Sequence, residues 1–113
     1  MGFYVTKHAQ ERWEQRKRPS YRNTPEVAYA GASDVPKDLM PLIRIPDDDL
    51  WRQAVGWGAA TYLINRRAGV VLVTRSYAAD TYLITVLNLK TIERRRAAMN
   101  ERRAKAQATR RRQ

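Results

Sequence analysis

The stretch TYLINRRAGVVLVTRSYAADTYLITVLN, residues 61–88, decides the fold of this 113-residue chain. It holds three runs rich in β-branched and aromatic residues, TYLIN, GVVLVTR and TYLITVLN, each with a period of two. The connections between them, NRRAG and SYAAD, have the length of hairpin loops. Because strands joined by such short loops pair antiparallel, the stretch predicts a three-stranded antiparallel meander.

The period of two also predicts which side chains share a face of this meander. The middle strand divides into two sets, Val71, Val73 and Arg75 on one face, and Val70, Leu72 and Thr74 on the other. The last strand divides in the same way, with Tyr82, Ile84 and Val86 opposite Thr81, Leu83, Thr85 and Leu87. Neither face is plainly polar, so we expect one to pack on helices and the other to be covered in part.

An amphipathic helix is predicted ahead of the meander, over residues 7–17. Thr6 is a suitable N-cap for it, and Pro19 prevents it from continuing. Ala9 and Trp13 are four residues apart, so they share one face of the helix. This apolar face indicates that the helix packs on the sheet.

Further elements are predicted between this helix and the meander. NTPEVAYAGA indicates a shorter helix with Thr24 as its cap, Pro25 as its first residue and Gly31 at its end. MPLIRIP, residues 40–46, indicates a short edge strand because prolines bracket it. PDDDLWRQAV indicates a helical turn that starts near Asp47.

Together these elements predict an α+β fold: N-terminal helices packed on a three- to four-stranded antiparallel sheet, followed by a basic C-terminal helical tail. We place the compact domain in residues 1–90 and the Arg-rich tail in residues 91–113. The tail consists of strong helix formers but has almost no apolar stripe, since only Ile92 and Met99 are available to form one. We expect its helix to begin at Thr91, to fray in water and to become ordered on a partner.

The charge of the chain is strongly positive and unevenly distributed. Lys and Arg number 22 against 11 Asp and Glu, which gives a formal net charge of +11. Residues 90–113 alone carry ten basic and two acidic side chains. Such a field attracts polyanions, of which nucleic acid is the commonest, and arginine can grip phosphate with two donors at once. We therefore expect nucleic acid to contact Arg75 on the sheet and the tail arginines Arg94, Arg95, Arg96, Arg102, Arg103, Arg110, Arg111 and Arg112.

Several classes of site are excluded by the composition. The chain has no cysteine, so no disulfide, zinc–thiolate site or thiol nucleophile is available. No stretch approaches the roughly 20 apolar residues that cross a bilayer. Lys7 and His8 interrupt any signal-peptide pattern. We expect no cofactor, no metal, no membrane contact and a cytoplasmic location.

Two clusters have both a functional and a structural interpretation. The carboxylates of Asp47, Asp48 and Asp49 could bind a divalent cation, but adjacent helical residues point in different directions, so we favour a role at a helix start. On the predicted sheet, tyrosine and arginine could stack bases and hold phosphates, or could simply be ordinary sheet residues that reach water. This second cluster consists of Tyr62, Arg75, Tyr77, Tyr82 and Thr85.

The only histidine, His8, forms a row with Arg12 and Arg16 at intervals of four residues. A neutral imidazole could take the proton of a 2′-hydroxyl while guanidinium groups stabilise the charge that builds on the phosphorane. This chemistry is metal-independent RNA cleavage, and Tyr82 is the fourth candidate catalytic residue. The alternative is a polar helix face with an incidental histidine, because this spacing is common on any helix.

A helix containing KHAQERWEQR followed by a meander ending in YLITVLN resembles small prokaryotic ribonuclease-toxin-like proteins, the RelE and BrnT relatives of the barnase–colicin group. The resemblance covers residues 4–88 and maps onto His8, Ala9, Arg12, Arg16 and Thr85. It implies metal-independent RNA cleavage. The chain departs from the pattern in having no second histidine as general acid, and in its Arg-rich tail. Small basic phage proteins that take over host machinery also look similar, and some are non-catalytic.

Three functions are compatible with these features. The first is a toxin-like ribonuclease. The second is a non-enzymatic protein whose tail docks on nucleic acid or on an acidic protein surface. The third is a structural protein of a phage or nucleoprotein particle, which would place it inside that particle. All three include binding to nucleic acid, for which we favour RNA over DNA, and none specifies an oligomeric state.

Overall fold

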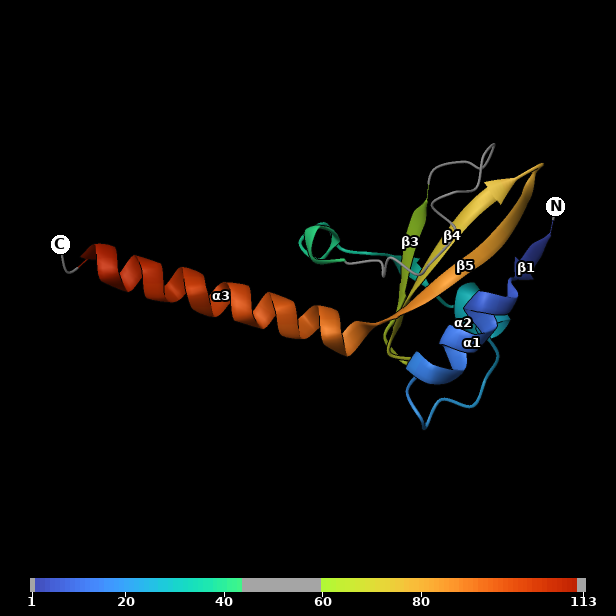
Figure 1. Ribbon diagram of the computed structural model, residues 1–113, viewed down its shortest axis with the longest axis horizontal. Coiled ribbons are helices and arrows are strands. Elements are labelled where there is room, and N and C mark those ends of the chain that lie inside the picture. The colour runs from blue at the N-terminus through green and yellow to red at the C-terminus, as the bar shows by residue number, and fades with distance from the viewer. Residues whose placement is uncertain (1, 44–59, 112–113) are drawn as a thin grey trace.

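The structure is a computed structural model that describes residues 2–43 and 60–111 (Figure 1). Its elements in chain order are β1 (Phe3–Val5), α1 (Lys7–Arg16), α2 (Pro25–Ala30), β2 (Ser33–Asp34), the 3₁₀ helix η1 (Met40–Leu42), β3 (Thr61–Asn65), β4 (Val70–Tyr77), β5 (Asp80–Asn88) and α3 (Leu89–Arg111). The predicted helical turn at Asp47 and the carboxylates that follow it lie outside the described residues. Among the helices of the described residues, none is long and apolar enough to cross a membrane.

The predicted meander is confirmed, since β3, β4 and β5 pair antiparallel in that order. The first hairpin turns through Gly69, whose φ is +70°. The second turns through Ala78 and Ala79, with φ of 51° and 69°. Left-handed backbone at both central residues is what a two-residue hairpin needs in order to match the twist of its strands. The three strands form the centre of the sheet.

The predicted antiparallel sheet of three to four strands is wrong, although the α+β class holds. The sheet is mixed and has five strands in the order β1-β5-β4-β3-β2, with β1 parallel to β5. β1 has three residues and β2 has two, which is too short for a repeating apolar pattern to be recognised in the sequence. These short strands pair with backbone groups that the meander leaves open at its two edges.

The edge strand predicted over residues 40–46 is also wrong where the structure describes it. Met40–Leu42 forms a 3₁₀ turn. Leu39 and Leu42 are both buried, and a turn of helix brings side chains three residues apart to the same side. An extended strand would point one of these leucines away from the core, because strand side chains alternate between faces.

The two N-terminal helices are confirmed, together with their caps. The hydroxyl oxygen of Thr6 accepts a hydrogen bond from the backbone N–H of Ala9 at 3.1 Å. Thr24 accepts one from the N–H of Val27 at 3.3 Å, and Gly31 follows the last residue of α2. Each threonine satisfies a donor that the first turn of its helix leaves without a partner.

The central part of the sheet is buried on both faces. α1 and α2 cover one face, where the buried cluster contains Ala9, Trp13, Ala28, Ala68, Val70, Leu72, Leu83 and Val86. The residues around η1 and the start of α3 cover the other face, where the buried cluster contains Val35, Leu39, Leu42, Ile64, Val71, Val73, Leu87, Leu89 and Ile92. The predicted division of the middle strand is therefore confirmed for its valines and Leu72.

The predicted division of the last strand is wrong, because β5 contains a bulge. Val73 pairs with Thr85 while the next residue of β4, Thr74, pairs with Leu83. One residue of β5, Ile84, is thus inserted into the ladder. The insertion brings Leu83 and Val86 into the same buried cluster, where strict alternation would have placed them on opposite faces.

α3 begins at Leu89, two residues before the predicted start, and its first turns belong to the core. The side-chain oxygen of Asn88 accepts a hydrogen bond from the N–H of Thr91 at 3.2 Å and caps the helix. Ile92 is 2% exposed, and Met99 packs against the same cluster. From there α3 projects away from the body (Figure 1), and the side chains of residues 100–108 are all exposed. We call residues 100–111 the arm; the predicted domain boundary after residue 90 stays a prediction.

Candidate phosphate-binding surface

α1 lies alongside β5 and is attached to it at both ends. The hydroxyl of Thr6 donates a hydrogen bond to the carbonyl oxygen of Leu83 at 2.9 Å. At the other end, the side-chain amide of Asn88 donates to the carbonyl oxygen of Arg16 at 3.5 Å. Helix and strand therefore run in the same direction, and the side chains along one edge of α1 follow the edge of β5.

His8, Arg12 and Arg16 occupy this edge of α1, and all three side chains are partly buried. They form one row, as their spacing predicts. Arg12 donates to the side-chain oxygen of Gln15 at 3.0 Å. Because eight residues of α-helix rise about 12 Å, His8 and Arg16 stand at opposite ends of the row.

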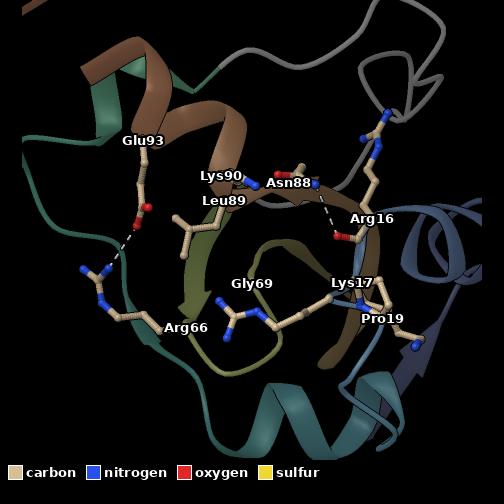
Figure 2. Close-up of a pocket in the computed structure, with 10 residues that line it drawn as sticks. Arg16, Lys17, Pro19, Arg66, Gly69, Asn88, Leu89, Lys90 and Glu93 are labelled. Carbon is tan, nitrogen blue, oxygen red and sulfur yellow. Dashed lines mark hydrogen bonds and ion pairs between the residues drawn. The ribbon is translucent and has the colours of Figure 1, made fainter. Parts of the chain in front are cut away.

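A pocket of about 580 Å³ opens at the Arg16 end of the row (Figure 2). Three separate parts of the chain line it: the end of α1 with the residues that follow, the β3–β4 turn, and the junction of β5 with α3. Five of the lining side chains are basic and one is acidic, namely Arg16, Lys17, Arg18, Arg66 and Lys90, and Glu93. We call this feature the basic pocket.

Backbone hydrogen bonds hold the three parts together beneath the basic pocket. The N–H of Arg18 donates to the carbonyl oxygen of Ala68 at 2.7 Å, and the N–H of Leu89 donates to that of Gly69 at 3.0 Å. The side chain of Arg18 lies against Gly69, where an added Cβ would meet its Cβ and Nε at 3.6 and 3.7 Å. The cations are therefore brought together by the fold and not by their positions in the sequence.

The charges of the basic pocket are only partly balanced within the chain. Arg66 forms an ion pair with Glu93 at 3.3 Å, on the side of the pocket opposite the Arg16–Asn88 contact (Figure 2). The side-chain amine of Lys17 donates to the carbonyl oxygen of Tyr21 at 2.8 Å. Within the described residues, the side chains of Arg18 and Lys90 make no hydrogen bond or ion pair. The start of α3 adds the positive end of a helix dipole. An anion with several acceptor oxygens would match this set of donors.

The predicted tail arginines have different surroundings. Arg95 donates to the carbonyl oxygen of Leu42 at 3.1 Å, and Arg96 forms an ion pair with Asp38 at 3.1 Å. These two arginines attach α3 to the residues around η1. Exposed side chains are found for Arg94, Arg102 and Arg103, whereas Arg110 and Arg111 lie in the last turn of α3 and Arg112 lies outside the described residues.

Tyr82 lies on the face of the sheet opposite α1, so it is separated from the row of His8, Arg12 and Arg16. Its neighbours in the sheet register are Arg75 on β4 and Tyr4 on β1. The rings of Tyr82 and Tyr4 stack with their centroids 5.4 Å apart. The four residues proposed for catalysis therefore do not converge on one point.

Thr85, to which the family resemblance also maps, is fully buried. Its hydroxyl oxygen has no hydrogen-bond partner within the described residues. It lies at the bulge of β5, opposite Val73. A buried side chain at this place does not reach a ligand on the surface.

Most of the basic pocket was missed by the sequence analysis. Lys17, Arg18, Arg66 and Lys90 share no helical or strand periodicity, and they come from three separate parts of the chain. The available signal was that each basic pair stands beside a turn or a helix end, in KRP and in NRRAG. Tyr4 was missed because β1 was not predicted.

Among the described residues, no group of three or more His, Asp and Glu side chains could hold a metal ion. No family model, no curated protein and no solved structure matches this chain. The function must therefore be inferred from the geometry and the charge of the molecule.

Proposed function

We propose that this protein binds nucleic acid, with a backbone phosphate in the basic pocket and further phosphates along the arm. The observation that supports the proposal is that one pocket at the root of the arm is lined by five basic residues, Arg16, Lys17, Arg18, Arg66 and Lys90. Like charges repel one another, so placing Arg18 and Lys90, whose side chains have no partner within the described residues, in one pocket with Arg66 is costly unless an anion neutralises them.

The concave shape of the site favours a flexible strand. A pocket of about 580 Å³ can accept a phosphate whose backbone bends towards it, whereas the phosphates of a regular duplex follow a fixed helical path. Most sequence-specific RNA recognition uses single-stranded loops, bulges and ends, in which the backbone has this freedom. The pocket is therefore better suited to RNA than to double-stranded DNA.

The arm extends the same basic surface. Residues 100–111 of α3 would rise about 18 Å. Its exposed described side chains include Arg102, Arg103 and Lys105. A helix with this composition has no apolar face to bury, so contacts with phosphates are the interaction that suits it. The arm supplies affinity that does not depend on base sequence.

Binding to a labelled single-stranded RNA, measured between about 50 and 200 mM salt, tests the proposal. One double variant combines Arg18→Gln with Lys90→Gln, since these two side chains have no partner within the described residues. A matched control combines Lys7→Gln with Lys37→Gln, both exposed and outside the pocket. Each double variant lowers the formal net charge of +11 by two.

The pocket variant is expected to bind about tenfold or more weakly than the control, and its salt slope should fall by about 0.7 to 0.9 for each phosphate that the protein no longer neutralises. Equal weakening in the two variants would mean that the overall charge binds RNA and the pocket does not. If the wild type binds no nucleic acid but captures an acidic protein, the docking-protein hypothesis replaces this proposal.

A second candidate function is metal-independent cleavage of RNA, supported by the row of His8, Arg12 and Arg16 along α1. A phosphate in the basic pocket lies at the Arg16 end of this row, about 12 Å of helix rise from His8. Cleavage would therefore require another phosphate, beside His8 and Arg12. The resemblance to ribonuclease toxins stays a hypothesis, and a variant of His8 tests it.

A further inference from the structure

Tyr4, Tyr82 and Arg75 form one row across three strands, at the end of the sheet opposite the basic pocket. The register pairs Tyr4 with Tyr82 and Tyr82 with Arg75. Phe3 and Val5 pack into the cluster beneath α1, so Tyr4, between them, points to the other face. We call these three residues the tyrosine row.

The rings of the tyrosine row are held in place. Tyr4 and Tyr82 stack with centroids 5.4 Å apart and an interplanar angle of 30°. The ring of Tyr4 also lies over Gly2, where an added Cβ would approach its hydroxyl oxygen to 2.9 Å. Gly2 is itself fixed, because its N–H donates to the side chain of Asp80 at 2.9 Å. Tyr4 is nevertheless 51% exposed.

We infer that the tyrosine row is a stacking platform for unpaired bases. An exposed aromatic ring with a fixed orientation offers a π-face to a base without loss of side-chain freedom on binding. Arg75 at the end of the row is partly buried. The basic pocket lies at the other end of β5. An unpaired strand can bring bases to the rings and phosphates to the pocket, which an apolar protein segment cannot do.

This inference rests on the proposed function and makes it more specific. β5 carries Tyr82 near one end and Asn88, beside the basic pocket, at the other. Six strand residues span about 20 Å. A single strand lying along this edge would place bases on the tyrosine row and a phosphate in the basic pocket. Paired bases are buried within their own duplex, so the protein should prefer single strands.

The test compares a short single-stranded RNA with an abasic strand of the same length, which has the same phosphates but no bases. Both are labelled, and fluorescence anisotropy gives the ratio of their affinities. The protein variants are Tyr4→Leu, which removes the ring, and Tyr4→Phe, which keeps it. Any loss of folding in Tyr4→Leu weakens binding of both strands, so the ratio isolates the contribution of stacking.

The wild type and Tyr4→Phe are expected to bind the base-bearing strand roughly fivefold or more tightly than the abasic strand, and Tyr4→Leu should lose most of this preference. Equal affinities of the wild type for the two strands, or a preference that Tyr4→Leu retains, would overturn the stacking inference and leave the proposed function intact. Absence of binding to either strand would overturn both.

Discussion

The guanidinium of Arg16 donates a hydrogen bond of 2.7 Å to the carbonyl oxygen of Val86. β1 ends opposite Leu83, so the part of β5 beyond that point has no strand beside it on this edge. Arg16 satisfies one of the backbone acceptors that would otherwise need a partner. Arg16 also lines the basic pocket, but its guanidinium points away from the other lining residues (Figure 2), so its bond to Val86 serves the edge of β5.

Arg16→Met is expected to destabilise the protein by about 1–3 kcal/mol, because it removes the donor to Val86 and keeps most of the apolar stem. Arg18→Gln, whose side chain has no hydrogen bond within the described residues, should change the free energy of unfolding by less than about 0.5 kcal/mol. Urea melts of both variants provide the measurement. A similar small change in both would show that the Arg16 bond contributes nothing to stability.

The packing of Ile92 predicts where the chain can be shortened. Ile92 is buried together with Val71 and Val73, although it follows the predicted domain boundary after residue 90. Ile92→Ala should cost about 2–5 kcal/mol. A chain that ends at Asn100 should keep the stability of the full chain, whereas one that ends at Lys90 should be destabilised by a comparable amount. Thermal or urea melts of the two truncated chains provide the comparison; equal midpoints would place the boundary where the sequence predicted it.

Deletion of residues 101–113 removes six basic and one acidic side chain. Binding to every RNA sequence should weaken, since phosphate contacts do not distinguish bases. The slope of log K against log salt should become less steep by about 0.7 for each phosphate of a single strand that the arm contacts. An unchanged slope after deletion would indicate that the arm contacts a protein instead.

Gly69 and Gly31 form a matched pair for testing backbone strain beneath the basic pocket. Gly69 has φ of +70°, where a side chain is strained, so Gly69→Ala should destabilise the protein by about 1–2 kcal/mol. Gly31 has φ of −95°, and an added Cβ there meets its nearest neighbours at an acceptable 3.7 Å. Gly31→Ala should therefore stay within about 0.5 kcal/mol of the wild type. Equal losses of stability for the two variants in urea melts would contradict the explanation that the left-handed backbone at position 69 requires glycine.

The features that were predicted correctly from the sequence depend on local patterns. Thr6 and Thr24 are followed at once by the helices they cap, and the meander shows its period of two over neighbouring residues. Ala9 and Trp13 share a helix face by spacing alone. Each of these predictions needs only residues that are close together in the chain.

The features that were missed depend on contacts between distant residues. β1 forms because Tyr4 comes to lie beside Tyr82. A run of three residues is too short to show a pattern that predicts this pairing. The extra residue Ile84 in β5 is visible only in the ladder with β4. The basic pocket likewise requires the turn at Gly69 to meet both Arg18 and Leu89, so its cations could not be grouped before the fold was known.

Cleavage of labelled RNA in EDTA tests the remaining hypothesis about His8. If His8 is a general base, His8→Gln should slow cleavage by about 10²–10⁴-fold, because glutamine can hydrogen-bond but cannot take a proton. Binding should change little, since His8 lies at the end of α1 away from the basic pocket. The product should carry a 2′,3′-cyclic phosphate, and EDTA should have no effect on a mechanism without metal. Arg12→Gln should also slow cleavage if a phosphate sits beside His8. Lys7→Gln, which removes a positive charge next to His8 in the sequence, serves as the control for charge. Equal rates for the wild type and His8→Gln would remove His8 from the mechanism, and no cleavage by either would leave the row as a basic edge that guides the strand towards the pocket.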